Sequence, residues 1–478
     1  MSSSKKNILL TGASGNMGQA TLAELFQRTD RFTVKALALD TPRDREILAP
    51  FQKQGLEVVW GDLTCYQDVL QAVSGADIVL HVGGLVSPYA DTRPELTLKV
   101  NVGAAENIVR AIQSQPDPDR VKLVYIGTVA QYGNRPVPIH WGRVGDPLKL
   151  STFDTYALSK TIAERVVIDS GLKNWLSLRQ TGIARMAAAE PLDPITFHTT
   201  LDGVLEWITP ADSGRLLANI CEDGVPEELW GNIYNIGGGA PNRLTNLELF
   251  DKMLGAAGVG DYREVLDPRW FALKNFHGQW YSDSDKLEQL VPFRQQTLDD
   301  YLKEQSRGVP WYIKLGGALP RLVKAKFEKV ARGPRGTLNW LAQGDMAHIK
   351  AYFGSLKLWK NIGGWDSIPA DRPPEQPIDL KHGFDESFLN KEISLPEVQD
   401  AAQFRGGELL STLLHPADWR SPLGWRCHAG HEFAASLNLI LKGGHWCPAC
   451  TANTSAYPYL AQHSAFFNQV WEPDHLVG

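Results

Sequence analysis

Thr11-Gly-Ala-Ser-Gly-Asn-Met-Gly18 lies between a short apolar run, Ile8-Leu-Leu10, and a helical pattern that extends from about Met17 to Arg28. Glycines in such a turn permit a tight bend and let a pyrophosphate approach the backbone closely. The helix that follows would present its free N–H groups and the positive end of its dipole to the phosphates. Because the turn opens a strand–turn–helix unit, it predicts a dinucleotide site. The predicted cofactor-binding residues of the turn are Gly12, Gly15, Asn16, Met17 and Gly18.

Short apolar runs alternate with amphipathic helical patterns through the first ~300 residues, which is the pattern expected of a parallel sheet. The apolar runs include residues 34–39, 57–60, 78–82, 121–126 and 175–178. Strands of this kind occur where helices cover both faces of a sheet. The sequence therefore predicts an α/β fold with a doubly wound parallel sheet.

A carboxylate, Asp40, ends the second predicted strand. At this point of a dinucleotide fold a carboxylate can accept hydrogen bonds from both ribose hydroxyls of NAD, and it would repel the 2′-phosphate of NADP. Arg43 and Arg45 lie close by in sequence and would weaken that repulsion. We expect NAD as the cofactor, with NADP as the alternative.

Tyr156-Ala-Leu-Ser-Lys160 places a phenol and an ammonium group four residues apart, on one face of a predicted helix. A tyrosine with a pKa near 10 is a poor proton shuttle at neutral pH. A nearby lysine cation and a positive nicotinamide ring would lower that pKa, so that Tyr156 could take a hydroxyl proton while hydride leaves. Lys160 could also hold the nicotinamide ribose. Upstream, Thr128 ends a predicted strand and could hydrogen-bond the reacting oxygen.

These motifs, in this order and spacing, resemble the extended short-chain dehydrogenases over about residues 5–305. That family includes sugar-nucleotide epimerases, dehydratases, uronate dehydrogenases and hydroxysteroid dehydrogenases. The segments 81–84, 101–108 and 234–239 resemble further landmarks of the family. The resemblance implies a Rossmann sheet with a smaller substrate lobe, mainly 180–300, and a homodimer formed through two helices, one of which carries Tyr156. It also implies Thr128, Tyr156 and Lys160 as the catalytic set, with Asp62 and Leu63 near the adenine.

Two departures from the family pattern bear on which activities we expect. Gly127-Thr128 stands where the family usually has a pair of serines, and threonine keeps the hydroxyl. The 4,6-dehydratases carry an Asp-Glu pair directly after that position, whereas this chain has Val129-Ala130. The acid and base for water elimination are therefore missing, and we do not expect a dehydratase.

Three of the five cysteines cluster near the C-terminus. Cys447 and Cys450 have the spacing of a zinc knuckle, and Cys427 offers a third thiolate. His431 is the expected fourth ligand, with His428 and His445 as competitors. The pattern resembles a zinc ribbon, which implies a closed, structural Zn²⁺ site. Such a module could contact protein or nucleic acid, although no basic surround supports that here.

The expected domain division is 1–305 for the dehydrogenase domain, 306–405 for a helical and linker region, and 406–478 for the zinc-ribbon-like module. The segment 311–336 holds seven basic residues against one acid, and we expect a solvated helix packed on its own protein more than a membrane or nucleic-acid contact. The proline-rich stretch 369–377 is typical of an extended linker. Ten of fifteen tryptophans lie at or after Trp270, so we expect the C-terminal part to bury cores of its own.

The bulk properties fit a folded protein without a strong surface charge. The formal net charge of −6 argues against a general nucleic-acid coat, and no apolar stretch has the length of a membrane span or of a signal peptide. The cysteines do not form a disulfide pattern, and Cys65 and Cys221 are expected to be isolated thiols. We expect a cytoplasmic protein.

Three functions fit these residues. The first is NAD-dependent oxidation of a secondary alcohol in a sugar, uronate or sterol-like substrate. The second is an NAD-dependent sugar or sugar-nucleotide epimerase, which uses the same triad without net redox change. The third, a non-catalytic dinucleotide-sensing scaffold, has no need of the intact triad. Candidate substrate contacts in the lobe, any of which could equally be core or surface residues, are Arg179, Arg185, His198, Trp207 and Arg243.

Overall fold

The computed structural model describes residues 5–186, 192–368 and 371–475. Its centre is a parallel sheet, as the sequence predicts, with seven strands in the order β3-β2-β1-β4-β5-β7-β9. The strand order reverses between β1 and β4, which opens a crevice at their carboxyl ends, where dinucleotides bind in such sheets. The strands are β1 (Lys6–Thr11), β2 (Phe32–Ala38), β3 (Glu57–Trp60), β4 (Ile78–His81), β5 (Lys122–Thr128), β7 (Trp175–Gln180) and β9 (Asn232–Ile236).

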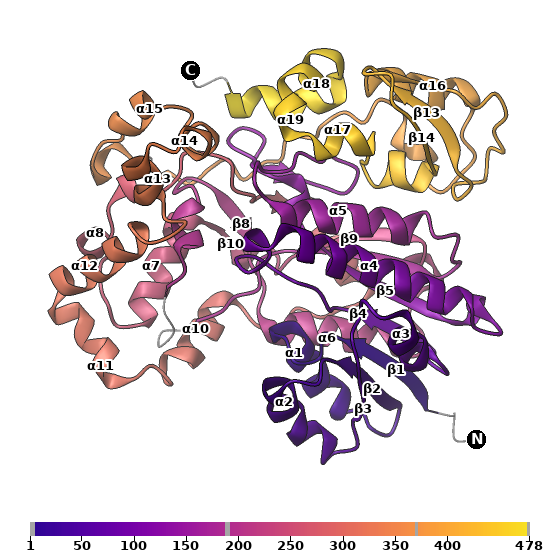
Figure 1. Cartoon of the computed structure of the whole chain (residues 1–478), viewed down its shortest axis with the longest axis horizontal. Coiled ribbons are helices and arrows are strands. Elements are labelled where there is room, and N and C mark those ends of the chain that lie inside the picture. The colour runs from indigo at the N-terminus through magenta and orange to yellow at the C-terminus, as the bar shows by residue number, and fades with distance from the viewer. Residues whose placement is uncertain (1–4, 187–191, 369–370, 476–478) are drawn as a thin grey trace.

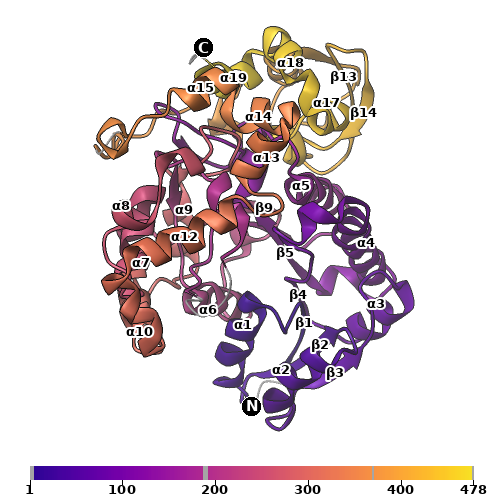
Figure 2. The ribbon, with the colours of Figure 1, turned by 60° about the vertical axis from the view of Figure 1, so that its left-hand side comes forward.

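Helices cover both faces of this sheet (Figures 1 and 2). One face carries α3 (Tyr66–Val73), α4 (Pro94–Gln113) and α5 (Thr155–Ile168), and the other carries α1 (Asn16–Phe26), α2 (Pro42–Gln52) and α6 (Pro210–Ile220). The central strands β5 and β7 are buried along almost their whole length. Burial on both faces explains why their sequences are continuous apolar runs without alternation.

The smaller lobe is built from short elements, some of which lie in sequence between strands of the large sheet. A two-stranded antiparallel pair, β8 (Val204–Glu206) with β10 (Arg243–Thr245), lies beside a parallel pair, β6 (Trp141–Gly142) with β11 (Trp280–Tyr281). The helices of the lobe are α7 (Asn246–Ala256), α8 (Tyr262–Val265) and α10 (Leu298–Ser306), whereas α9 (Ser284–Leu290) packs on the large sheet through Leu287.

Residues 306–405 are mainly helical, and their first helices pack on this lobe (Figure 1). The basic helix α12 turns Val323, Phe327 and Val330 toward Trp270 and Phe271 of the lobe. Residues 371–377 contain no helix or strand, while Pro369 and Ala370 lie outside the described residues. The helices of this region are α11 (Trp311–Lys314), α12 (Pro320–Ala331), α13 (Thr337–Gln343), α14 (Met346–Phe353), α15 (Leu356–Lys360) and α16 (Leu395–Phe404).

The C-terminal module is a three-stranded antiparallel sheet followed by helices. Its tryptophans Trp425 and Trp446 belong to the same buried cluster as the apolar residues of α4 and α5. The expectation of a separate core is therefore wrong for this module, because so small a sheet completes its burial against the large domain. Its elements are β12 (Gly407–Leu409), β13 (Leu423–Cys427), β14 (Glu432–Ala435), α17 (Pro448–Ala452), α18 (Tyr457–His463) and α19 (Ala465–His475).

Among the described residues, no helix combines the length and the apolar character that crossing a bilayer would require.

Candidate active site

The glycine turn after β1 has a shape that only glycine permits at two positions. Gly12 has a φ of +70°, and a Cβ atom there would lie 2.7 Å from the Cα atom of Gly83. A Cβ atom on Gly18 would lie 2.1 Å from the carbonyl oxygen of Gly12. Asn16 and Met17 begin α1 directly behind Gly15, and no side chain among the described residues caps the N-terminus of this helix. The predicted turn residues are thus brought together in the geometry of a phosphate site.

Asp40 follows β2 at the edge of the crevice, where it is paired with Arg45. The Nε and Nη2 atoms of Arg45 donate to the two carboxylate oxygens at 2.5 and 2.8 Å. The same guanidinium lies 4.6 Å from the ring centroid of Trp60. The hydrogen bond from Arg45 lowers the pKa of Asp40, so the carboxylate is ionised at neutral pH. Since a carboxylate has about four acceptor positions, Asp40 keeps capacity for ribose hydroxyls.

The residues expected near the adenine lie in the turn after β3. Asp62 Oδ1 accepts a hydrogen bond from the backbone of Thr64 at 2.8 Å, so its side chain stabilises the turn itself. Leu63 comes close to Gly83, which in turn is the neighbour of Gly12. The structure therefore places Leu63 beside the glycine turn and gives Asp62 a local structural contact.

Thr128, Tyr156 and Lys160 come together at the carboxyl end of β5. Asp154 caps the N-terminus of α5 by accepting from the backbone of Ala157 at 2.7 Å, so Tyr156 lies in the first turn and Lys160 one turn later. Burial raises the pKa of Tyr156 to about 12, and a hydrogen bond with Thr128 acts in the opposite direction. Burial lowers the pKa of Lys160 to about 8, and its Nζ atom lies 4.8 Å from the ring centroid of Tyr125.

A buried polar network that the sequence reasoning missed lies behind this trio. Gln131 Oε1 accepts from the backbone N–H of Thr128 at 3.1 Å, and Gln131 Nε2 donates to Glu164 Oε2 at 2.7 Å. Asn101 Nδ2 donates to Ser159 Oγ at 2.9 Å. One signal was available, because Glu164 stands four residues after Lys160 on a helix and shares its face.

His81, at the end of β4, contacts Thr11, the residue that precedes Gly12 of the glycine turn. Its Nδ1 atom lies 2.9 Å from Thr11 Oγ1, which accepts a hydrogen bond from the backbone of Gly83 at 2.9 Å. Complete burial and the nearby Lys160 cation lower the pKa of His81 to about 3. The imidazole is therefore neutral in the folded protein at physiological pH.

We expect this histidine to make stability depend on pH. Between about pH 6.5, its ordinary pKa, and pH 3, the unfolded chain binds a proton at His81 that the folded chain does not, so stability falls as pH falls through that window. His81→Asn, which keeps a polar atom for Thr11, should make the melting temperature decline less between pH 7.5 and pH 5. Thermal melts of both proteins across that range measure the difference. Parallel curves would exclude His81 as the source.

Three of the candidate substrate-binding residues form ion pairs or hydrogen bonds within the protein. Arg179 is fully buried in an ion pair with Glu164, and Arg243 pairs with the buried Glu206. His198 Nε2 contacts the carbonyl oxygen of Arg335 at 2.8 Å. Trp207 is half-buried, and its indole N–H is buried without a hydrogen-bond partner among the described residues. Arg179 and Arg243 are therefore structural residues of the core, which is the alternative that the sequence left open for them.

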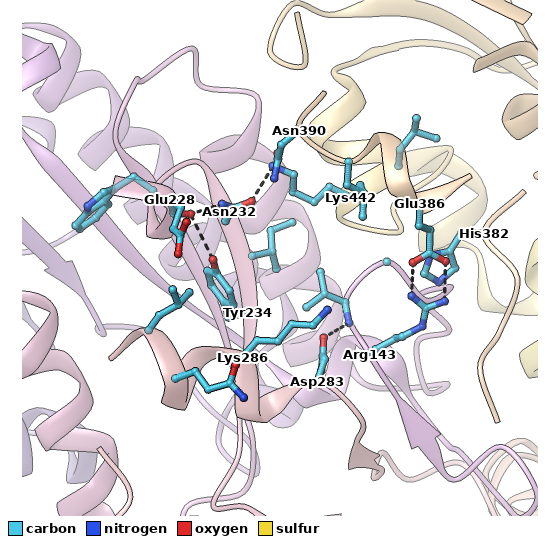
Figure 3. Close-up of a pocket in the computed structure, with 18 residues that line it drawn as sticks. Arg143, Glu228, Asn232, Tyr234, Asp283, Lys286, His382, Glu386, Asn390 and Lys442 are labelled. Atoms are coloured by element: carbon cyan, nitrogen blue, oxygen red, sulfur yellow. Dashed lines mark hydrogen bonds and ion pairs between the residues drawn. The ribbon is translucent and has the colours of Figure 1, made fainter. Parts of the chain in front are cut away.

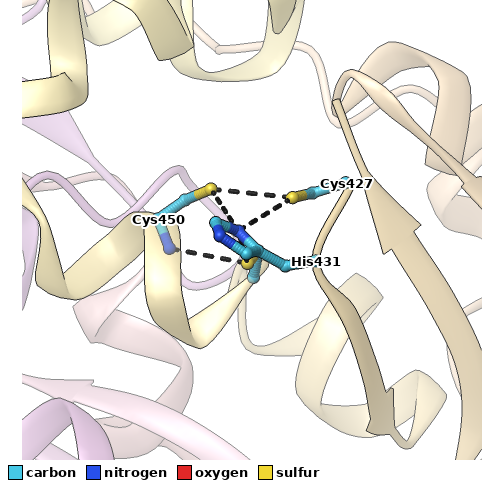
Figure 4. A group of neighbouring side chains, drawn as sticks. Cys427, His431 and Cys450 are labelled. Carbon is cyan, nitrogen blue, oxygen red and sulfur yellow. Dashed lines mark hydrogen bonds between the residues drawn. The ribbon is translucent and has the colours of Figure 1, made fainter. Parts of the chain in front are cut away.

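The four predicted metal ligands converge in the C-terminal module (Figure 4). The Nδ1 atom of His431 lies 3.4 Å from Cys427 Sγ and 3.5 Å from both Cys447 Sγ and Cys450 Sγ. The sulfurs of Cys427 and Cys450 are 3.7 Å apart. Of the two competing histidines, His445 contacts Glu164 at 2.8 Å and His428 stacks on His463.

These distances have the dimensions of a tetrahedral zinc site. Zn–S bonds of about 2.3 Å and Zn–N bonds of about 2.0–2.1 Å give ligand–ligand edges of roughly 3.5–3.8 Å in a tetrahedron. The separations of 3.4–3.7 Å in the structure agree with those edges. Sulfur and imidazole nitrogen are the ligand atoms that zinc prefers in structural sites. Three thiolates and an imidazole therefore fit a divalent metal ion.

Comparison with known proteins identifies the N-terminal part of the chain. Residues 8–179, which contain the glycine turn and all three of Thr128, Tyr156 and Lys160, match the NAD dependent epimerase/dehydratase family. The matched segment is less than half of the chain. It agrees with the resemblance to the extended short-chain dehydrogenases that the motifs indicate.

Curated relatives from this family have more than one activity. The chain is 27% identical over 168 residues to 3 beta-hydroxysteroid dehydrogenase type 7 of Mus musculus, covering 34% of this chain and 44% of that protein. It is 26% identical over 110 residues to UDP-glucose 4-epimerase of Rickettsia massiliae, covering 22% of this chain and 32% of that protein. The matched part thus spans less than half the length of these relatives.

Solved structures support the fold. A dTDP-glucose 4,6-dehydratase from Streptomyces venezuelae with NAD and TYD bound is 21% identical, has a TM-score of 0.51, and matches 64% of this chain and 96% of its own. The dTDP-glucose 4,6-dehydratase of Bacillus anthracis in complex with NAD is 16% identical, with a TM-score of 0.51 and coverage of 65% and 97%. At such identities the likeness shows the shared architecture alone.

Proposed function

We propose that this protein is an NAD-dependent oxidoreductase that oxidises a secondary alcohol of a small sugar, uronate or sterol-like substrate. The observation that carries the proposal is the convergence of Thr128, Tyr156 and Lys160 at the strand ends, next to a glycine turn that opens toward the same crevice. A sensor of dinucleotides would need the turn but not the three polar side chains.

The chain's own residues supply the proton transfer. Tyr156 accepts the proton of the substrate hydroxyl, and Thr128, whose Oγ1 accepts from Ala130 N at 3.2 Å, keeps its hydroxyl hydrogen to donate to the reacting oxygen. When bound, NAD supplies the hydride acceptor and a positive ring charge. The ammonium of Lys160 adds a second positive charge. Both charges stabilise the phenolate of Tyr156, and they therefore lower the pKa that burial has raised.

An epimerase is the second candidate, because a relative named UDP-glucose 4-epimerase is 26% identical to this chain over 110 residues. It would use the same residues, with hydride returned to the opposite face of the substrate. The experiment that separates the two is a panel of uronates, sugar nucleotides, sterols and simple secondary alcohols incubated with the protein and NAD. Stoichiometric NADH supports the oxidoreductase, and an inverted stereocentre without NADH supports the epimerase. Absence of both with every substrate class would contradict both activities.

We propose NAD as the preferred cofactor because of Asp40. Asp40→Ala should raise the KM for NAD by roughly tenfold or more, since a lost hydrogen bond to a charged group is worth about 1.5–3 kcal/mol. The same change should improve the use of NADP, because it removes a repelling charge and frees Arg45 for the 2′-phosphate. Steady-state kinetics with both cofactors measure this, with the exposed Asp30→Ala as the matched control. An unchanged KM for NAD would exclude Asp40 from the cofactor site.

We further propose that Cys427, His431, Cys447 and Cys450 hold a structural Zn²⁺. A homodimer, contacts of the metal module with protein or nucleic acid, and a cytoplasmic location remain predictions. Any dimer interface through α5 would have to share that helix with the C-terminal module, because Arg165 already donates to the carbonyl oxygen of Ala434 at 2.7 Å.

A further inference from the structure

The C-terminal module is joined to the catalytic helix α5 by polar contacts as well as by apolar packing. Asp169 Oδ1 accepts from Ser436 Oγ at 2.6 Å near the end of that helix. At the edge strand β9, Lys442 Nζ donates to the carbonyl oxygen of Gly231 and to Asn232 Oδ1 at 3.0 and 2.8 Å, beside a cavity of about 600 Å³ (Figure 3). The module is therefore held along two elements of the dehydrogenase domain.

One of these contacts reaches the network behind the active site. Glu164 is completely buried, and its carboxylate accepts from Arg179, from Ser177 Oγ at 2.6 Å and from Gln131 Nε2 at 2.7 Å. His445 Nε2 lies 2.8 Å from Glu164 Oε2. Arg179 Nη2 also donates to the carbonyl oxygen of Gly443 at 2.7 Å. The loop that precedes the metal ligand Cys447 thus completes the surroundings of this buried ion pair.

The network continues to two catalytic residues. Gln131, which is held by Glu164, accepts the backbone N–H of Thr128 at 3.1 Å. Lys160 lies one helical turn before Glu164 on the same face of α5. A displacement of Glu164 would therefore reach the backbone of Thr128 through Gln131, and it would reach Lys160 through the shared helix α5.

We propose that residues 443–447 form a positioning element of the active site. A metal ion held by Cys447 and Cys450 fixes the preceding loop, and His445 then holds Glu164, Gln131 and Thr128 in their catalytic arrangement. This inference rests on the proposed oxidoreductase function. It assigns the appended module a catalytic role that the matched family segment, residues 8–179, does not contain.

The test compares His445→Ala with His445→Gln, whose amide can still donate to Glu164. His445→Ala should lower kcat by roughly tenfold to a hundredfold with little change in the KM for NAD, as expected when reacting groups are misplaced. His445→Gln should recover part of that loss. His463→Ala, in the same module but outside this contact, is the matched control. A kcat within about twofold of wild type for His445→Ala, with normal metal content, would overturn the proposal.

Hydrogen exchange of the α5 amides provides a readout that needs no turnover. Both metal removal and His445→Ala should speed exchange over residues 156–168 while exchange in β1 and α1 stays unchanged. If no substrate is turned over, the proposed activity fails. The exchange measurement still shows whether the metal module and His445 stabilise helix α5. Identical α5 exchange in the metal-bound and metal-free protein would overturn it.

The surface of α11 and α12 exposes large apolar side chains next to basic ones. Five large apolar side chains are exposed within twelve residues, with Trp311 74% and Leu322 66% exposed; the others are Tyr312, Leu315 and Leu319. Contiguous exposed apolar surface of this kind marks an interaction site. We define this set, together with Lys314, Arg321, Lys326 and Lys329, as the basic apolar surface.

The charge of this surface contrasts with that of the chain. Segment 311–336 carries seven basic residues and one acid in a protein with a formal net charge of −6. In the described part of the chain, Lys314, Arg321, Lys326 and Lys329 form no ion pair, whereas Arg332 pairs with Glu328. Because the inner face of α12 is packed on the lobe, the basic apolar surface is presented as a fixed outer face.

We propose that the basic apolar surface docks on an anionic lipid bilayer. Tryptophan, tyrosine and leucine next to unpaired lysines are the residue types that enter the headgroup region, while the cations attract anionic lipids. A nucleic acid would match the charges but would leave the leucines unburied.

Co-sedimentation with phosphatidylcholine vesicles, with and without phosphatidylserine, tests this proposal. Binding should require phosphatidylserine and weaken with salt. The double variant Lys326→Glu with Lys329→Glu should reduce vesicle binding by about tenfold or more, since each basic residue contributes about 1 kcal/mol at such a surface. The double variant Trp311→Ser with Leu315→Ser should reduce binding by a similar factor, because it removes apolar side chains that enter the headgroup region. The controls are the exposed Leu413→Ser and the pair Lys53→Glu with Lys173→Glu. Absence of binding, equal binding to both vesicles, or self-association through this surface would overturn it.

Discussion

Tyr156→Phe should lower the rate of substrate oxidation by about 10²–10⁴-fold, the usual contribution of a positioned acid–base group. The change removes only the phenolic oxygen, so the ring continues to pack in the first turn of α5. The loss should appear in kcat, because Tyr156 acts on the substrate proton. The measurement is the initial rate of NADH formation with the substrate class that the panel identifies.

The control for this variant is cofactor binding, which should stay within about twofold of wild type because the glycine turn and Asp40 are untouched. Tyr301→Phe, a phenol buried in the lobe away from the trio, is a matched substitution and should keep most of the activity. Full activity of Tyr156→Phe would remove this residue from the mechanism.

The double variant Cys447→Ser and Cys450→Ser should lose the bound metal and unfold the C-terminal module. Metal binding supplies folding free energy in small modules of this kind. We expect the first thermal transition to fall by roughly 10 °C or more, since about 2–4 °C corresponds to 1 kcal/mol in a domain of 150–250 residues. Elemental analysis gives the metal content, and limited proteolysis should cut within residues 406–478.

The exposed, isolated Cys65 provides the matched control, because Cys65→Ser changes a thiol far from the metal ligands in sequence. It should retain one metal ion per chain and the wild-type melting curve. Wild-type protein purified without zinc, or a double variant that melts like wild type, would refute a structural metal site.

The elements that the sequence predicted well are those with strong local signals. The glycine turn, the apolar strands and the Tyr156–Lys160 spacing are each fixed by a few neighbouring residues, and the structure has the expected parallel sheet. The ligand cluster was also visible, because Cys447 and Cys450 are close in sequence and His431 follows Cys427 by four residues.

The long-range contacts could not be predicted in the same way. Glu164 and His445 are 281 residues apart, and no local pattern indicates that they meet. Arg179 looked like a substrate contact because arginines bind anions, but burial against Glu164 makes it part of the core. The C-terminal part was expected to bury cores of its own, whereas the apolar residues of its last module join those of α4 and α5. Each of these outcomes depends on tertiary packing.

Calorimetric titration of the purified protein with NAD tests whether NAD binds at the glycine turn beside Tyr156. We expect one NAD per chain. We also expect that Gly15→Asp, which puts a negative charge at the N-terminus of α1 where the pyrophosphate should lie, abolishes binding without unfolding the protein. The wild-type protein must first be shown to carry no nucleotide from purification. If it then gives no heat of binding, or if Gly15→Asp binds NAD equally well, NAD does not bind at the glycine turn.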